Sequence, residues 1–212
     1  MANKGETKYL SIVAHYEACL DRYGDTHLGV DWPKQSDAET RYRIMLEIIR
    51  GTEAGPTTLL DFGCGASHLY EYIVSNRIQN LVYSGLDISR KFIELSNRKF
   101  PANEYYCLDI LTADTRLPSF DYIVMNGVFT EKREMSFDEM LAYFKRLAKL
   151  VFERADKGIA FNVMSKQVDW EREDLFHLSL DTLADFVTKE LTRNLIIRND
   201  YGLYEYTAYV YR

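Results

Sequence analysis

From residue 57 onward, segments whose hydrophobic pattern is typical of a strand alternate along this chain with segments whose pattern is typical of a helix. Short apolar runs rich in β-branched and aromatic residues predict strands, and apolar positions spaced three or four apart predict helices. The predicted strands cover residues 58–61, 81–87, 104–108, 120–125, 158–164, 193–199 and 204–211. The predicted helices between them cover residues 69–76, 90–99, 136–154 and 179–190. This alternation predicts a mostly parallel sheet with right-handed crossovers and helices on both faces.

The last two predicted strands form an exception to the parallel pattern. Only residues 200–203 connect them. A parallel crossover needs about a dozen residues or more, so these two strands must pair in the antiparallel direction.

Two further helices are predicted before the first strand. Helical spacing extends over residues 6–23 and 36–51, and Ser36 is a candidate N-cap for the second helix. Gly55 and Pro56 then interrupt the chain. Because these helices precede the central alternation, their apolar faces must pack against the outside of the core.

The length and composition predict one domain. A chain of 212 residues, of which 47% are hydrophobic, can bury a single substantial core. We expect one domain over residues 1–212, in which residues 1–52 form a helical lid and residues 57–212 form the α/β core.

Charge and cysteine content restrict the partners and the compartment. The net charge of −6, without a cluster of more than two basic residues, argues against binding of nucleic acid. No apolar run approaches the length of about 18 residues that spans a membrane, and the polar N-terminus does not resemble a signal peptide. Cys19, Cys64 and Cys107 are odd in number and far apart, which is typical of the reducing cytoplasm. The four histidines show no ligand spacing with these cysteines, so we expect no metal.

The stretch after the first predicted strand carries the clearest chemical signal. The strand ends in Asp61, and a loop with Gly63 and Gly65 leads into the next helix. Glycine adopts positive φ and has no Cβ, so a ligand can lie directly against this backbone. The pattern Asp-x-Gly-x-Gly resembles the first motif of class I S-adenosylmethionine-dependent methyltransferases. The third glycine of that motif would fall at Ser67, where a small residue still fits.

Polar residues at the ends of the next strands match later motifs of the same family. Asp87 ends the second strand, Asp109 the third and Asn126 the fourth. Ligands of doubly wound sheets bind at these strand ends, so four matches in order are a specific signal. The resemblance also implies a seven-stranded sheet with an antiparallel last strand, a Rossmann-like fold.

The resemblance implies a role in binding S-adenosylmethionine for each of these positions. Asp61 would hold the loop and the methionine amino group, and the backbone of Gly63, Cys64 and Gly65 would pass beneath the cofactor. Asp87 would accept hydrogen bonds from the ribose hydroxyls. The adenine ring would meet Asp109 at its amino group, with Ile88 and Ile110 on either side. In the lid, Tyr16, Trp32 and Arg41 are candidates for the sulfonium or the carboxylate, since the Arg41 fork can bind both carboxylate oxygens.

The acceptor is expected to be a small molecule or a saccharide, methylated on oxygen. A freestanding domain with a helical lid is similar to methyltransferases that act on small metabolites and sugars. A hydroxyl acceptor must lose a proton, and a base with a pKa near neutrality serves best. We expect His27 to be this base, Asp31 to orient it and Asn126 to position the acceptor, with His177 as the alternative base.

Two other functions remain open at this point. One is a nicotinamide-dependent oxidoreductase, but its third fingerprint glycine would fall at His68 and no tyrosine is followed four residues later by lysine. The other is a nucleotide-binding module without catalytic activity. The sequence does not distinguish a monomer from a homodimer.

Overall fold

The computed structural model describes residues 7–51, 55–112 and 117–212. Of the range expected as the lid, residues 1–6 and residue 52 lie outside the described residues. The helices are α1 (Leu10–Tyr23), the short 3-10 helix η1 (His27–Val30), α2 (Gln35–Leu46), α3 (His68–Ser75), α4 (Arg90–Lys99), α5 (Phe137–Phe152) and α6 (Leu180–Glu190). The strands are β1 (Thr57–Phe62), β2 (Leu81–Asp87), β3 (Glu104–Cys107), β4 (Phe120–Met125), β5 (Ala155–Ser165), β6 (His177–Leu178), β7 (Leu195–Arg198) and β8 (Glu205–Tyr211).

The sheet confirms the doubly wound fold. Its strand order is β3-β2-β1-β4-β5-β8-β7, and the strands from β3 to β5 in this order are parallel. As predicted from their short connection, β7 and β8 are antiparallel, and β8 also pairs antiparallel with β5. The apolar pattern does not predict the strand β6, because two residues are too few to show a period; this strand pairs with the end of β5.

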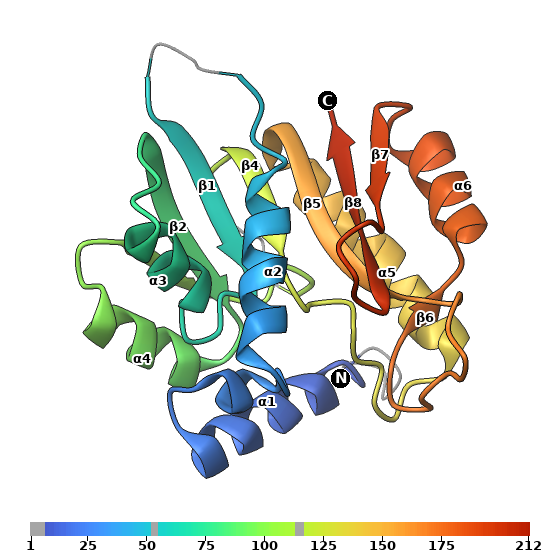
Figure 1. Ribbon diagram of the computed structural model, residues 1–212, viewed down its shortest axis with the longest axis horizontal. Coiled ribbons are helices and arrows are strands. Elements are labelled where there is room, and N and C mark those ends of the chain that lie inside the picture. The colour runs from blue at the N-terminus through green and yellow to red at the C-terminus, as the bar shows by residue number, and fades with distance from the viewer. Residues whose placement is uncertain (1–6, 52–54, 113–116) are drawn as a thin grey trace.

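Helices cover both faces of the sheet, as Figure 1 shows. The helices α5 and α6 pack on one face, where Phe144 makes edge-on contacts with Phe129 and Phe161 and contacts Phe186 of α6 at 5.3 Å between ring centroids. The other face is covered by α2 and α3. These two apolar layers enclose the sheet and leave the carboxyl ends of its parallel strands uncovered by α2, α3, α5 and α6.

The helix α2 is part of this second layer. Its Ile44 and Met45 are fully buried, and the hydroxyl of Tyr209 on β8 donates a hydrogen bond to the Ile44 carbonyl. The helix begins at Gln35, so the expectation that Ser36 caps it is wrong: the N-cap is Lys34 and makes no side-chain cap bond. The segment that reaches past the strand ends is therefore α1 with η1, below the tips of the strands in Figure 1.

Candidate functional site

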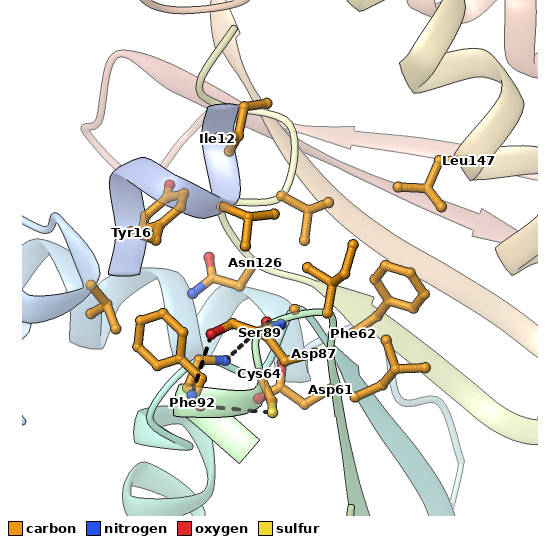
Figure 2. Close-up of a pocket in the computed structure, with 18 of the residues that line it drawn as sticks. Ile12, Tyr16, Asp61, Phe62, Cys64, Asp87, Ser89, Phe92, Asn126 and Leu147 are labelled. Carbon is orange, nitrogen blue, oxygen red and sulfur yellow. Dashed lines mark hydrogen bonds between the residues drawn. The ribbon is translucent and has the colours of Figure 1, made fainter. Parts of the chain in front are cut away.

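A cleft lies at the carboxyl ends of β1, β2 and β4, and α1 forms its opposite wall (Figure 2). The residues predicted from the sequence that line this cleft are Tyr16, Trp32, Asp61, Gly63, Cys64, Gly65, Asp87, Ile88, Asp109, Ile110 and Asn126. The strand-end residues thus converge as their spacing predicts. Their roles toward a ligand stay predictions at this stage.

The turn after β1 is held close to the end of β2. Gly63 and Gly65 have φ of 75° and 51°, in the left-handed region that favours glycine. The N–H groups of Gly63 and Cys64 both donate to the Leu86 carbonyl, at 2.7 and 2.9 Å. A Cβ on Gly63 would lie 2.7 Å from Cγ2 of Val128, so no side chain fits there. The turn therefore presents bare backbone to the cleft.

Ser67, at the position of the third glycine of the motif, has a left-handed backbone conformation. Its φ is 58°, and the residue is fully buried. The Ser67 hydroxyl donates to the hydroxyl of Ser96 at 2.8 Å and lies 3.0 Å from the Tyr105 hydroxyl. These bonds satisfy a buried polar group, so the departure from the glycine pattern is accommodated locally.

Two buried carboxyl groups lie on the floor of the cleft. Asp61 is 2% exposed and accepts a hydrogen bond of 2.8 Å from the Tyr83 hydroxyl. Burial raises the pKa of Asp61 to about 7, although this hydrogen bond opposes the shift. Asp87 accepts from the N–H groups of Gly65 at 3.0 Å and Ser89 at 2.8 Å, and burial raises its pKa to about 6. Both acids would gain from a ligand that brings a cation or hydrogen-bond donors.

A third acid is already engaged by α1. Asp109 accepts a hydrogen bond of 2.5 Å from the Tyr9 hydroxyl and one of 2.9 Å from the Leu111 N–H. The Tyr9 ring stacks on Tyr143, with 5.2 Å between the ring centroids. Sequence reasoning missed Tyr9, although it shares the helical spacing of Ile12, Val13 and Tyr16, which line the cleft beside it.

The wall at the end of β4 combines an unpaired oxygen with an aromatic side chain. Asn126 Oδ1 is buried and has no hydrogen-bond partner within the described part of the chain. Next to it, Gly127 has φ of 82°, and a Cβ there would lie 2.8 Å from Cζ2 of Trp32. Trp32 therefore packs directly on the Gly127 backbone. Tyr16 faces the same space from α1, near Asn126 in Figure 2.

Solved structures that align with this fold include methyltransferases. Magnesium protoporphyrin IX methyltransferase from Synechocystis PCC 6803, solved with bound S-adenosylmethionine, aligns with a TM-score of 0.63 and 14% identity over 96% of this chain and 97% of that chain. A S-adenosylmethionine-dependent methyltransferase from Leishmania major aligns with a TM-score of 0.66 and 13% identity over 97% of this chain and 83% of that chain. At such identities the likeness establishes the fold alone.

Sequence comparisons carry the identification. Residues 60–153 match the family model of a methyltransferase domain. A provisionally named methyltransferase of Mycobacterium tuberculosis, Rv1506c, is 24% identical over 159 residues, which make up 74% of this chain and 94% of that protein. The chain is a class I S-adenosylmethionine-dependent methyltransferase.

S-adenosylmethionine, the methyl donor of this enzyme, fits the polar groups of the cleft. The cofactor carries an ammonium group, two ribose hydroxyls and an adenine amino group, all of which donate hydrogen bonds. The cleft offers acceptors for them: the buried carboxyls of Asp61 and Asp87, which have raised pKa values, and the carboxyl group of Asp109. The donors of S-adenosylmethionine are matched by acceptors in the cleft, so the residues of the cleft suit this cofactor.

Arg41 of the methyltransferase lies behind the cleft wall. Its guanidinium group binds Glu205 through Nε, at 2.9 and 3.0 Å, and Nη2, at 2.7 Å. The same group lies 4.1 Å from the centroid of the Trp32 ring. Glu205 also accepts from Asn162, whose Oδ1 accepts from the Gly127 N–H. Nε and Nη2 are thus engaged by Glu205 and Arg41 does not line the cleft, whereas its Nη1 is buried without a hydrogen-bond partner among the described residues. That the Arg41 fork binds a cofactor carboxylate stays a prediction.

The expected pair of His27 and Asp31 does not form. Asp31 has φ of 56°, and its Oδ2 lies 2.8 Å from Nε2 of His15 on α1. His27 lies instead in a surface groove between η1, α2 and α3. The expectation that Asp31 orients His27 is therefore wrong, because the left-handed turn at Asp31 directs its carboxylate to α1.

His177 is fixed by backbone groups. Its Nε2 accepts from the Arg172 N–H at 3.2 Å, and its Nδ1 lies 2.7 Å from the Ser165 carbonyl. In the first bond Nε2 is the acceptor, so Nδ1 is the nitrogen that donates to the Ser165 carbonyl. With both nitrogens engaged, His177 stabilises the loop before β6, and it does not line the cleft.

Two groups of polar residues, one where the lid meets α3 and one within the lid, were missed by sequence reasoning. His68 lines the cleft, and its Nε2 lies 2.8 Å from Asp25 Oδ1. His15 and Cys19 lie four residues apart on α1, with ligand atoms close to Asp31. The expectation that no histidine and cysteine share a ligand spacing is therefore wrong for this pair, which is separated by one helical turn.

Among the described residues, no helix is long and apolar enough to cross a membrane.

Proposed function

We propose that this methyltransferase methylates a hydroxyl oxygen of a small molecule or saccharide. The observation that carries the proposal is the unpaired, buried Asn126 Oδ1 in a cleft that is covered by α1 and η1. A buried oxygen without a partner favours a ligand that donates a hydrogen bond, as a hydroxyl does. The helical cover favours an acceptor small enough to enter beneath it.

The proposed contacts to the cofactor follow the cleft from floor to rim. The carboxylate of Asp61 would receive the ammonium group, and Asp87 would receive the ribose hydroxyls. Asp109, Ile88 and Ile110 would surround the adenine, once the Tyr9 hydroxyl shares or releases Asp109. The backbone of Gly63, Cys64 and Gly65 would support the cofactor from below, because these residues bring no large side chain into the cleft.

The charge of the protein supports an uncharged or weakly charged acceptor. The net charge of −6 disfavours the phosphate backbone of RNA or DNA. Asn126 is followed by Gly127, Val128 and Phe129, and not by the two prolines and aromatic residue of enzymes that methylate amide or nucleobase nitrogens. Both observations favour a small hydroxylated acceptor.

The residues of the cleft would act mainly by alignment. The cofactor supplies an activated methyl group on a sulfonium centre. Tyr16, Trp32 and Val30 would exclude water from the reacting atoms, and Asn126 would orient the acceptor hydroxyl. Among the described histidines, His68 lines the cleft, so it replaces His27 as the candidate that receives the hydroxyl proton.

A methyl-transfer assay with a panel of acceptors tests this proposal. The purified chain is incubated with methyl-labelled S-adenosylmethionine and hydroxylated small molecules, saccharides, amines, a peptide mixture and RNA. We expect label in a hydroxylated acceptor as a methyl ether. Label that enters only amines, peptide or RNA would contradict the assignment to hydroxyl oxygen.

Variants of the three histidines test the proton acceptor. We expect His68→Ala to lower kcat at saturating cofactor, and His27→Ala to keep its rate within a few-fold. A large loss of kcat in His27→Ala with an unchanged rate in His68→Ala would reverse this assignment. His177→Ala is expected to lower thermal stability more than kcat, because both of its ring nitrogens bind backbone groups.

A further inference from the structure

Three side chains with metal-binding atoms converge where α1 meets η1. His15 and Cys19 lie on the face of α1 that packs against η1, and Asp31 follows η1 directly. His15 Nε2 lies 2.8 Å from Asp31 Oδ2 and 3.8 Å from Cys19 Sγ. All three ligand atoms lie within 4.8 Å of one another. None of the three residues lines the cofactor cleft.

The donor set suits a tetrahedral zinc ion. Imidazole nitrogen, thiolate sulfur and carboxylate oxygen are the ligands that Zn²⁺ uses in proteins, at about 2.0–2.3 Å. Ligand atoms at those distances are separated by roughly 3–4 Å, so the His15–Asp31 contact needs to open only slightly. A thiolate and a carboxylate together balance the charge of the ion.

The surroundings allow an ion to enter and leave a fourth position open. The Asp31 side chain is 38% exposed and that of His15 is 21% exposed, so the group is reached from solvent. Cys19 lies beneath them and is buried. With three protein ligands, water would complete the tetrahedron.

We propose that His15, Cys19 and Asp31 bind one Zn²⁺ ion that ties α1 to η1. Both elements contribute to the cleft, α1 through Tyr16 and η1 through Val30. The ion would therefore hold the two parts of the cover in one arrangement, and it takes no part in methyl transfer. The proposal is independent of the acceptor and of the proposed function.

Cobalt titration of the full chain tests the site directly. The protein is freed of metal with a chelator, and Co²⁺ is added as a spectroscopic probe. We expect one equivalent of Co²⁺ per chain, a thiolate-to-cobalt charge-transfer band in the near ultraviolet, and displacement by Zn²⁺. Cys19→Ser should abolish the band, whereas the matched control Cys107→Ser, which alters an exposed free cysteine, should keep it.

Two outcomes would overturn the proposal. One is the absence of a charge-transfer band in the wild-type protein, which would leave the His15–Asp31 contact as a hydrogen bond alone. The other is a band that persists in folded Cys19→Ser or disappears in Cys107→Ser.

A second measurement covers the case in which Cys19→Ser does not fold. X-ray absorption at the zinc edge of the Cys107→Ser protein should show one sulfur at about 2.3 Å together with nitrogen or oxygen ligands. A zinc environment without sulfur would refute the site. If zinc binding fails while methyl transfer persists, only the metal proposal falls, so the two proposals remain distinguishable.

Discussion

Tyr9 and Asp109 lie 100 residues apart in the chain, and the Tyr9 hydroxyl donates a hydrogen bond of 2.5 Å to Asp109 Oδ2. Asp109 is also the acid that we expect to receive the adenine amino group. The hydroxyl of the lid and the amino group of the cofactor are both donors, so they compete for the same oxygen. We therefore expect the position of α1 and cofactor binding to be coupled at this contact.

Removal of the Tyr9 hydroxyl should tighten cofactor binding. Tyr9→Phe keeps the ring on Tyr143 and frees Asp109. A hydrogen bond has a net worth of about 0.5–1.5 kcal/mol, so we expect the Kd for S-adenosylhomocysteine to fall roughly two- to tenfold. Titration calorimetry measures this change. Weaker binding in Tyr9→Phe would mean that the hydroxyl contacts the ligand and does not compete with it.

Loss of the Asp87 carboxylate should weaken cofactor binding more than any change at the surface. Hydrogen bonds to a charged group are worth about 1.5–3 kcal/mol, and Asp87→Ala should raise the Kd for S-adenosylhomocysteine accordingly. The exposed Asp169 provides a control, and Asp169→Asn should leave the Kd unchanged. Equal affinities of Asp87→Ala and the wild type would contradict the prediction that Asp87 binds the ribose hydroxyls.

The raised pKa of Asp61 makes the ligand-free protein sensitive to pH. Burial raises this pKa to about 7, whereas a carboxyl in an unfolded chain has a pKa of about 4. Between these two pH values the folded protein holds a proton on Asp61 that the unfolded chain releases. The contribution of this group to the free energy of unfolding is therefore fully present below about pH 4 and is lost as the pH rises to about 7. Asp61→Asn cannot ionise, so it should be more stable than the wild type at pH 8, by no more than about 4 kcal/mol, with a smaller difference at pH 5. Thermal unfolding of the two proteins at both pH values measures this difference; a larger advantage at pH 5 would contradict the assignment.

The effect on stability of the close packing of Trp32 on Gly127 can be distinguished from the effect of backbone strain at that glycine. A Cβ at Gly127 would lie 2.8 Å from Trp32, whereas Gly202 has a similar φ of 76° and a Cβ there would meet nothing within 4 Å. A left-handed backbone at a non-glycine residue costs about 1–3 kcal/mol, and this cost is common to both alanine variants. Gly127→Ala should therefore lose more stability than Gly202→Ala and also lose cofactor affinity. Equal effects of the two substitutions would show that Trp32 moves away freely.

Local patterns in the sequence predict the sheet and the floor of the cleft. The glycine turn after Asp61, and the acids Asp87 and Asp109, each stand directly after a short apolar run that predicts a strand. The structure brings these strand ends together in one cleft, as expected. The motif also places a small residue, Ser67, at the third glycine position, and the structure gives it a left-handed φ of 58°.

Contacts between distant segments cannot be predicted in this way. The sequence places Arg41 in the cleft, but its partner Glu205 lies 164 residues away and no local signal joins the two. Proximity in the chain pairs Asp31 with His27, whereas the left-handed backbone of Asp31 turns it toward His15. Side-chain direction in a loop depends on such backbone angles, which the pattern of apolar residues does not encode.

The central claim is that the cleft above Asp61, Gly63, Asp87 and Asp109 binds the methyl donor. Titration calorimetry of the full chain with S-adenosylhomocysteine, and with the nicotinamide cofactor NADH as a control, tests this claim most directly. We predict one binding site for S-adenosylhomocysteine, a rise in Tm with the ligand, and no response to NADH. Absence of heat and of a Tm shift with S-adenosylhomocysteine, or a response to NADH alone, would contradict the account.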